Sequence, residues 1–269
     1  MKIGITGGKG FIGSHLVPVL RKLGHQCELF EEFGARIEDE VAMRRFVKGK
    51  NVVIHLAGKN KGSNEELLKV NVLGTQILLS AVQEISPATR IIFASTVQVY
   101  LEDSFYGFSK QLAENILQFY ASAHEISSIS LRFTNLYGFG GKPFYNSVIA
   151  TFIYQLKSGK SITINGDGSD KRDYLFVEDA VSAIVSTVNC VSTDCFLVLD
   201  ICSGKKYSLL HIVNILKKYW PTGIKVLTNK QFSTSWKFRL SNKRAMKVLS
   251  WEPKVPLEEG MMRLIKNEN

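Results

Sequence analysis

The chain has 269 residues, of which 45% are hydrophobic and 22% are charged, and its formal net charge is +10. This length is enough for one large domain or for a domain that carries a smaller lobe. No apolar run approaches the roughly 20 residues that a membrane-spanning helix needs, so we expect no membrane segment. The four cysteines and five histidines show none of the spacings of metal sites. We therefore predict no metal, reduced thiols and a cytoplasmic location.

Much of the excess positive charge lies in residues 221–251, which contain seven lysines and arginines and no acidic residue. Such a segment serves solubility, an anionic small molecule or a nucleic acid. We find no zinc finger, no RNA-recognition motif and no interleaving of aromatic and basic residues. The sequence therefore predicts no nucleic-acid partner, and the role of the segment stays open between the other two.

Short apolar runs alternate with segments of helical periodicity over the first half of the chain. Strands alternating with helices indicate right-handed βαβ units and a parallel sheet covered on both faces, which is a doubly wound, Rossmann-like α/β fold. The expected strands are residues 2–6, 27–30, 51–57, 90–95 and 128–133, and the expected helices are residues 11–23, 38–48, 64–84 and 106–124.

Beyond residue 134 the alternation is looser. One further strand is expected at 195–200, and it is expected to return to the main sheet. We predict a Rossmann domain over residues 1–134 and a smaller, mainly substrate-binding lobe over residues 135–269. Helices are expected in this part at residues 146–158, 178–188, 208–219, 242–249 and 257–267.

The first expected strand runs directly into a TGxxGxxG pattern made by Thr6, Gly7, Gly10 and Gly13. Glycine lets the backbone turn tightly and approach a pyrophosphate without a Cβ in the way. The N-terminus of the following helix offers free N–H groups to the same anion. A glycine loop alone is often only a tight turn, but its place between a strand and a helix predicts dinucleotide binding.

Glu31 and Glu32 follow the second expected strand. A carboxylate at this point accepts hydrogen bonds from the adenosine ribose hydroxyls and repels a 2′-phosphate. Glu31 therefore favours NAD over NADP as the cofactor. The alternative is a solvated acidic pair in a loop.

Seven motifs, in the same order along the chain, resemble the extended short-chain dehydrogenase/reductase family, and within it the NAD-dependent epimerases and dehydratases of nucleotide sugars. The resemblance covers nearly the whole chain. The motifs are TGGKGFIGSHL (6–16), VVIHLAG (52–58), NVLGT (71–75), YGFSK (106–110), LRFTNLYG (131–138), INGDGSDKRDYLFVEDA (164–180) and LSWEPKVPLEEGM (249–261).

The resemblance implies an NAD site, a site for a nucleoside-diphosphate sugar, and a homodimer in which segments 64–84 and 106–124 pair across a two-fold axis. In the substrate site, Arg172 is expected to meet the diphosphate. The implied substrate contacts are Ser95, Thr96, Tyr106, Asn135 and Arg172. The implied cofactor contacts are Gly7, Gly10, Phe11, Ile12, Gly13, Glu31, Ile37, Leu56, Ala57, Gly58, Asn71, Tyr106 and Lys110.

Two features depart from the family pattern. Where relatives have an aspartate followed by isoleucine or leucine near the adenine, this chain has Arg36 and Ile37. The segment between Tyr100 and Tyr106 is very short, whereas many relatives insert a long, substrate-covering loop there.

Tyr106 and Lys110 are four residues apart on an expected helix and so project from one face. A tyrosine with its ordinary pKa of about 10 is a poor base at neutral pH, but a nearby ammonium and a positive nicotinamide both favour the tyrosinate. An isolated Tyr-x-x-x-Lys is usually a surface pair. After a matching phosphate loop we interpret Tyr106 and Lys110 as catalytic, and the resemblance adds a hydroxyl four residues before Tyr100. This is Thr96, with Ser95 as the alternative.

The residues after Thr96 narrow the reaction. Water-eliminating relatives carry an Asp-Glu pair there, and decarboxylating relatives carry a glutamate two residues before the tyrosine, but this chain has Val97 and Gln98. Glutamine cannot exchange a proton near neutral pH. We therefore predict an NAD-dependent epimerase, an isomerase that oxidises and re-reduces one sugar carbon, commonly C4. The alternatives are an oxidoreductase (a 4-ketoreductase or dehydrogenase) and a non-catalytic, NAD-sensing relative, although the latter typically loses the tyrosine or the lysine.

Overall fold

The structure is a computed structural model that describes residues 1–190, 194–229 and 238–266. The chain divides into two compact units. The first comprises residues 1–133, 181–201 and 243–251, and the second comprises residues 134–180, 202–242 and 252–269. Each unit is built from segments that are distant in sequence.

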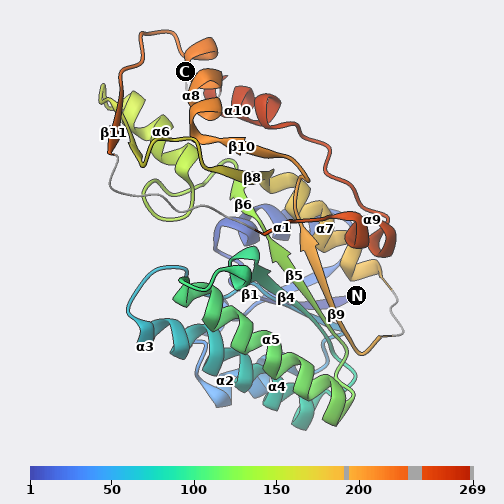
Figure 1. The fold of residues 1–269 in the computed structure, drawn as a ribbon. Helices are drawn as coiled ribbons and strands as arrows, with labels where there is room; N and C mark the ends of the chain where they lie inside the picture. The colour runs from blue at the N-terminus through green and yellow to red at the C-terminus, as the bar shows by residue number, and fades with distance from the viewer. Residues whose placement is uncertain (191–193, 230–237, 267–269) are drawn as a thin grey trace. The chain divides into compact units, whose positions relative to one another are not determined.

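The first unit is a parallel sheet of six strands in the order β2-β1-β3-β4-β5-β9 (Figure 1). The central strands are buried along almost their whole length, as expected for a sheet covered on both faces. The α/β fold class expected from the sequence is confirmed. The strands are β1 (Lys2–Thr6), β2 (Gln26–Leu29), β3 (Val52–His55), β4 (Arg90–Thr96), β5 (Ser128–Phe133) and β9 (Phe196–Ile201).

Helices α2, α4 and α5 cover one face of this sheet, where their apolar side chains form one buried cluster with Val53, Ile91 and Phe93. The helices associated with the first unit include two short 3₁₀-helices, η1 and η3. They are α1 (Phe11–Lys22), η1 (Phe30–Phe33), α2 (Glu40–Val47), α3 (Asn64–Leu67), α4 (Gly74–Ile85), η3 (Val97–Tyr100), α5 (Phe105–His124), α7 (Val177–Asn189) and α9 (Lys243–Leu249).

The helix expected over residues 64–84 is continuous, but its middle part is not α-helical. Between α3 and α4 the chain forms a π-helix, η2 (Leu68–Leu73), in which the Gly74 N–H donates to the carbonyl of Lys69, five residues earlier. A π-turn holds one residue more than an α-turn and frequently marks a functional site. Asn71, an expected cofactor-site residue, lies inside it and is fully buried.

The second unit contains two small sheets, of order β10-β8-β6 and β11-β7. Its strands are three to six residues long, and polar residues interrupt several of them, so they lack the apolar runs that identified the strands of the first unit. Part of the basic segment 221–251 lies outside the described residues. The elements are β6 (Asn135–Tyr137), α6 (Val148–Lys157), β7 (Ile162–Asn165), β8 (Lys171–Phe176), β10 (Lys206–Ser208), α8 (Leu209–Tyr219), β11 (Val226–Asn229) and α10 (Leu257–Lys266).

Among the described residues, none of the helices combines the length and the hydropathy that crossing a bilayer requires.

Candidate active site

The loop after β1 is shaped by its glycines. Gly7 has a φ of +74°, which favours glycine, and a Cβ on it would lie 2.6 Å from the backbone nitrogen of Ala57. The N–H of Gly10 closes the turn on the carbonyl of Gly7 at 3.0 Å. A Cβ on Gly13 would collide with the carbonyl oxygens of Gly7 and Gly8. The loop therefore packs tightly against the segment that follows β3 and against the start of α1. Only glycine fits at positions 7 and 13.

Helix α1 begins at this loop, so the N–H groups of its first turn are available to bind an anion. Its N-cap is Gly10, which has no side chain to cap the helix, and its first turn contains no acidic residue. The first N–H groups of a helix lack partners within the helix and favour negative charge. The expected cofactor residues Phe11 and Ile12 lie in this first turn and are half-buried. The geometry fits the pyrophosphate of a dinucleotide.

Glu31 lies in η1, at the carboxyl end of β2 and therefore at the same edge of the sheet. Its Oε2 atom is buried and has no hydrogen-bond partner. A buried, unpaired carboxylate oxygen is costly unless a ligand donates to it. This atom fits a ribose hydroxyl, so the residues present at this edge fit NAD.

Of the two residues expected near the adenine, Ile37 is partly buried and Arg36, which precedes it, is exposed. Ile37 packs on the start of α4, where a Cβ added to Gly74 would lie 3.0 Å from two of its side-chain carbons. Ile37 thus contributes to the hydrophobic cluster under α2 and α4.

The segment that follows β3 carries Leu56, Ala57 and Gly58. The amide of Asn71 fixes the next residue, because its Oδ1 accepts from the Lys59 N–H and its Nδ2 donates to the Lys59 carbonyl, both at 2.8 Å. Nδ2 also donates to the hydroxyl of Ser109 at 2.9 Å. Asn71 therefore joins the segment after β3 to helix α5.

Lys110 is buried beneath the first turns of α5. Its side chain is 3% exposed and its Nζ lies 4.0 Å from the centre of the Phe93 ring. Burial lowers the pKa of Lys110 to about 7, although Glu114 opposes the shift. A Cβ on Gly58 would lie 3.6 Å from Nζ. The ammonium thus reaches the segment after β3 from the α5 side.

Tyr106 stands one turn before Lys110, in the first turn of α5, and is half-buried. This turn rests directly on η3, because a Cβ at Gly107 would collide with the carbonyl of Gln98. The N-cap of α5 is Ser104, whose hydroxyl accepts from the Gly107 N–H at 3.0 Å and donates to Gln98 Oε1 at 2.9 Å. These contacts fix the turn that carries Tyr106 against the end of β4.

Thr96 and Ser95 end strand β4, and both are buried. The hydroxyl of Thr96 accepts from the Gln98 N–H at 3.2 Å and so caps η3. The hydroxyl of Ser95 has no hydrogen-bond partner in the structure. Because Ser95 and Thr96 are consecutive residues of β4, their side chains point to opposite faces of the sheet. The choice between the two hydroxyls as the substrate-positioning group stays a prediction.

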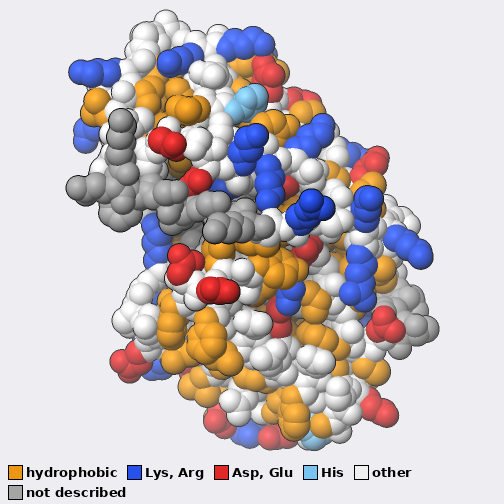
Figure 2. All heavy atoms as spheres, in the orientation of Figure 1, with side chains coloured by type: hydrophobic (Ala, Val, Ile, Leu, Met, Phe, Trp, Pro, Cys, Tyr) orange, Lys and Arg blue, Asp and Glu red, His pale blue; other side chains and the backbone are white. Residues whose placement is uncertain are grey.

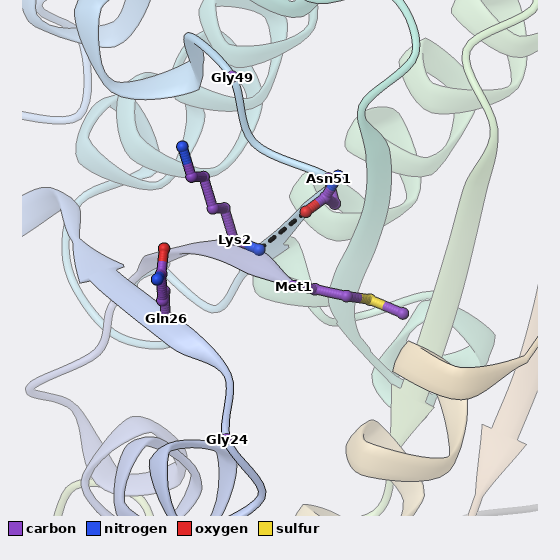
Figure 3. Close-up of a pocket in the computed structure, with 6 residues that line it drawn as sticks. All are labelled: Met1, Lys2, Gly24, Gln26, Gly49 and Asn51. Atoms are coloured by element: carbon purple, nitrogen blue, oxygen red, sulfur yellow. Dashed lines mark hydrogen bonds between the residues drawn. The ribbon is translucent and has the colours of Figure 1, made fainter.

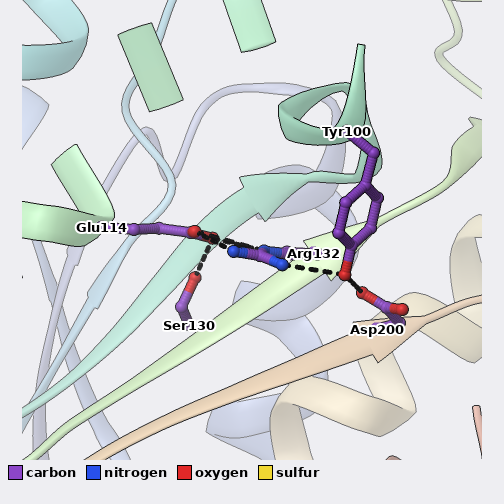
Figure 4. A network of polar contacts seen from close by, with 5 residues as sticks. All are labelled: Tyr100, Glu114, Ser130, Arg132 and Asp200. Carbon is purple, nitrogen blue, oxygen red and sulfur yellow. Dashed lines mark hydrogen bonds and ion pairs between the residues drawn. The ribbon is translucent and has the colours of Figure 1, made fainter. Parts of the chain in front are cut away.

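Tyr100, the other tyrosine near this edge, is held by a polar network (Figure 4). Its hydroxyl accepts from Arg132 Nη1 at 2.8 Å and donates to Asp200 Oδ1 at 2.9 Å. Arg132 in turn pairs with the buried Glu114 of α5, at 2.5 Å between Nη2 and Oε2. Burial and the charge of Asp200 raise the pKa of Tyr100. Tyr100 is therefore poorly suited to releasing a proton. No sequence motif predicts this network.

The expected substrate residues Asn135 and Arg172 lie in the three-stranded sheet of the second unit. Asn135 Nδ2 donates to the carbonyl of Asp173 at 2.9 Å. Arg172 lies opposite Tyr207 in the sheet, and Asn135 lies opposite Tyr174, so all four side chains share one face. The hydroxyl of Tyr174 is buried and has no hydrogen-bond partner.

A pocket of about 440 Å³ opens at the other end of the strands (Figure 3). It is lined by residues at the amino ends of β1, β2 and β3, among them Lys2, Gln26 and Asn51. Ligands of doubly wound sheets bind at the carboxyl ends of the strands. This pocket therefore lies apart from the glycine loop, Glu31 and the end of β4.

Residues 3–193 match the model of the NAD dependent epimerase/dehydratase family. This match spans more than half of the chain, and the chain belongs to this family. The family expected from the sequence motifs, its dependence on NAD and its enzymatic nature are confirmed.

Relatives in this family include enzymes of more than one reaction. The UDP-glucuronic acid decarboxylase 1 of Danio rerio is 25% identical, over 98% of this chain and 72% of its own length. The structure of a UDP-glucose 4-epimerase from Thermotoga maritima with UDP-glucose is 26% identical and superposes with a TM-score of 0.86, covering 99% of this chain and 98% of the other. MoeE5 with UDP-glucuronic acid and NAD is 25% identical, has a TM-score of 0.87 and covers all of both chains.

Proposed function

We propose that this protein is an NAD-dependent epimerase of nucleoside-diphosphate sugars, which inverts one sugar carbon, most commonly C4 in similar enzymes. The observation that carries the proposal is that α5 carries Tyr106 and the buried Lys110 one turn apart, while Val97 and Gln98, neither of them acidic, directly follow Thr96 at the end of β4. The names of the similar solved structures make UDP-hexoses and UDP-hexuronic acids the first substrates to test.

Bound NAD would supply the acceptor for a hydride from the sugar carbon and the donor for its return. Tyr106 removes the proton from the hydroxyl on that carbon and later gives it back. Lys110 supplies the positive charge that stabilises the tyrosinate, and Thr96 hydrogen-bonds the same sugar hydroxyl. Inversion follows when the intermediate keto-sugar presents its other face before re-reduction.

Gln98 separates this chain from relatives that eliminate water or carbon dioxide. Its side-chain oxygen accepts the hydroxyl proton of Ser104, so the side chain contributes to the start of α5. An amide neither donates nor accepts a proton in acid–base catalysis near neutral pH. We therefore place the activity in hydride transfer without elimination or decarboxylation.

Incubation of the purified protein with a panel of UDP-sugars, followed by separation of the sugar products, tests the proposal. An epimerase converts the substrate to its C4 epimer with no net formation of NADH. A ketoreductase or dehydrogenase, the second candidate, changes the NADH concentration by one equivalent per turnover. A non-catalytic NAD-binding protein gives neither result while still binding NAD.

We also propose a cytoplasmic homodimer. In the part of the chain that the structure describes, the four cysteines, Cys27, Cys190, Cys195 and Cys202, form no disulfide, as is usual in a reducing compartment. Apolar side chains are exposed on α4 and α5, including Ile85 (42%), Phe108 (48%) and Phe119 (60%). Figure 2 shows hydrophobic side chains gathered over the region of α4 and α5. Light scattering at two concentrations tests the dimer, which a concentration-independent monomer mass would contradict.

A further inference from the structure

His55 is the last residue of β3, and neither its motif nor the proposed chemistry assigns it a role. It is fully buried, and burial lowers the pKa of its imidazole to about 3, with Lys110 adding to the shift. The ring is therefore neutral at physiological pH, with one donor nitrogen and one acceptor nitrogen. A buried neutral imidazole needs a partner for each of them.

Both partners are buried threonines. His55 Nδ1 lies 2.6 Å from Thr6 Oγ1, and Nε2 lies 3.1 Å from Thr75 Oγ1. The Thr75 hydroxyl donates its one proton to the carbonyl of Asn71, at 2.7 Å. Thr75 must therefore accept from His55, which fixes the proton on Nε2 and makes Nδ1 the acceptor of the Thr6 hydroxyl.

Through further hydrogen bonds, Thr6 and Thr75 are connected to opposite ends of the segment between Ala57 and Lys59. Thr6 Oγ1 accepts from the Ala57 N–H at 3.2 Å, and the Asn71 amide holds both backbone groups of Lys59 at 2.8 Å. The segment between these points contains Gly58. The backbone of this segment is thus held at Ala57 and at Lys59. His55 connects the two sets of contacts, because it hydrogen-bonds both Thr6 and Thr75.

The connection also extends to α5. Asn71 Nδ2 donates to Ser109, and the Ser109 hydroxyl donates to the carbonyl of Tyr106 at 2.8 Å. The π-helix η2 carries Asn71 at the centre of these contacts. One continuous set of hydrogen bonds therefore runs from the strand before the glycine loop to the turn that carries Tyr106.

We propose that His55 is a positioning residue that fixes the segment Leu56–Lys59 and the π-helix relative to the glycine loop, and so sets the geometry of the cofactor site. This inference rests on the proposed NAD site. His55 touches neither cofactor nor substrate in this account and acts through Thr6, Thr75 and Asn71. A role in packing alone would require only a ring of this size.

The test compares His55→Phe, which keeps a ring without hydrogen bonds, with His55→Asn and His55→Gln. The asparagine amide reaches the Nδ1 position and the glutamine amide reaches the Nε2 position, so each restores one end of the connection. Calorimetric titration gives the Kd for NAD, steady-state kinetics give kcat at saturating NAD and UDP-sugar, and thermal unfolding gives Tm. We expect His55→Phe to weaken NAD binding by about 10-fold or more and to lower kcat, with partial recovery in one of the two amide variants.

Thr75→Val and Thr187→Val form a matched pair that does not depend on the folding of His55→Phe. Both threonines are fully buried, and each donates to a helix carbonyl four residues earlier, Asn71 for Thr75 and Ala183 for Thr187. Only Thr75 also accepts from His55. We expect similar losses of Tm, but a higher Kd for NAD and a lower kcat in Thr75→Val alone.

Variants that lose Tm but keep the wild-type Kd for NAD and the wild-type kcat would overturn the inference, since His55 would then serve packing only. Equal changes in the Kd for NAD and in kcat for Thr75→Val and Thr187→Val would overturn it as well. A wild-type protein that binds no NAD would overturn the proposed function itself. NAD binding by the wild type with unchanged variants would overturn the role of His55 and leave the proposed function standing.

Discussion

The hydroxyl of Ser104 joins Gln98 to the first turn of α5, accepting from the Gly107 N–H at 3.0 Å and donating to Gln98 Oε1 at 2.9 Å. Gln98, which directly precedes Val99 in η3, thus helps to hold the first turn of the helix that carries Tyr106.

The first prediction removes this hydroxyl. Ser104→Ala should lower the free energy of unfolding by about 1 kcal/mol, which is typical for loss of an N-cap. It should also lower kcat, because the turn that carries Tyr106 loses its contact with Gln98. Ser147→Ala is the control, since Ser147 caps α6 through the Ala150 N–H in the same way. Urea unfolding should show similar losses for both variants, and a kcat lowered equally by both would contradict the prediction.

Cofactor choice depends on Glu31. We expect the wild-type protein to bind NAD more tightly than NADP, because a 2′-phosphate meets the unpaired Oε2 carboxylate oxygen. Glu31→Gln removes the charge and should raise NADP affinity by about 10-fold, a change typical of one charged contact. Glu32→Gln, at an exposed neighbour, should leave both affinities unchanged. Equal binding of NAD and NADP by the wild type would refute the assignment and would direct attention to Arg36.

The diphosphate site is tested at Arg172. Arg172→Ala should weaken binding of a UDP-sugar by about 10-fold or more, because charge-assisted hydrogen bonds are lost, while the Kd for NAD stays near wild type. Lys171→Ala, at the exposed preceding residue, should change neither affinity. Ser203 donates to Asp173 Oδ2, and the backbone N–H groups of residues 254 and 255 donate to Asp179. An equal loss of NAD affinity would make Arg172 a structural residue.

Lys110 should destabilise the folded protein at neutral pH. Burial holds its pKa near 7, against 10.5 for an ordinary lysine. Between these values the unfolded chain binds a proton that the folded chain does not, so the contribution of Lys110 to stability rises with pH over this interval and its penalty is complete below about pH 7.

We therefore expect Lys110→Met to unfold at a higher urea concentration than wild type at about pH 7, and the difference to shrink at about pH 9.5. The same variant should lose turnover and NAD affinity. Lys48→Met, at an exposed lysine, provides the control, and its effect on stability should not change with pH over this range. A destabilised Lys110→Met protein at both pH values would contradict the account of the buried ammonium.

The parallel sheet and the glycine loop were predictable because each rests on local sequence. Apolar runs identify strands buried on both faces, and the TGxxGxxG pattern follows one of them directly. The strands β6 (NLY), β8 (KRDYLF) and β10 (KYS) have no comparable signal, because polar or charged residues occupy part of each strand.

The features of the site that could not be predicted from the sequence depend on contacts between distant residues. The π-helix around Asn71 inserts an extra residue that a helical pattern does not reveal. His55 sits within an apolar strand, VVIHLAG, and that polar residue in an otherwise buried run was the one available sign of its hydrogen bonds. The pairing of Arg132 with Glu114 joins different elements and becomes visible only in the fold.

The central claim is that Tyr106 is the residue that transfers the proton. Tyr106→Phe keeps the ring and removes only the hydroxyl, so folding and the Kd for NAD should be retained. General acid–base catalysis is commonly worth about 10²- to 10⁴-fold, and we expect kcat to fall within that range. Tyr100→Phe is the matched comparison, because Tyr100 lies near the same strand end but its hydroxyl is held between Arg132 and Asp200.

The decisive measurement is kcat for both variants on a UDP-sugar that the wild-type protein epimerises. The account predicts a large loss of kcat in Tyr106→Phe, with NAD binding intact, and a small loss in Tyr100→Phe. Abolished turnover in Tyr100→Phe together with wild-type turnover in Tyr106→Phe would contradict it, and Tyr106 would then be an ordinary residue on a helix.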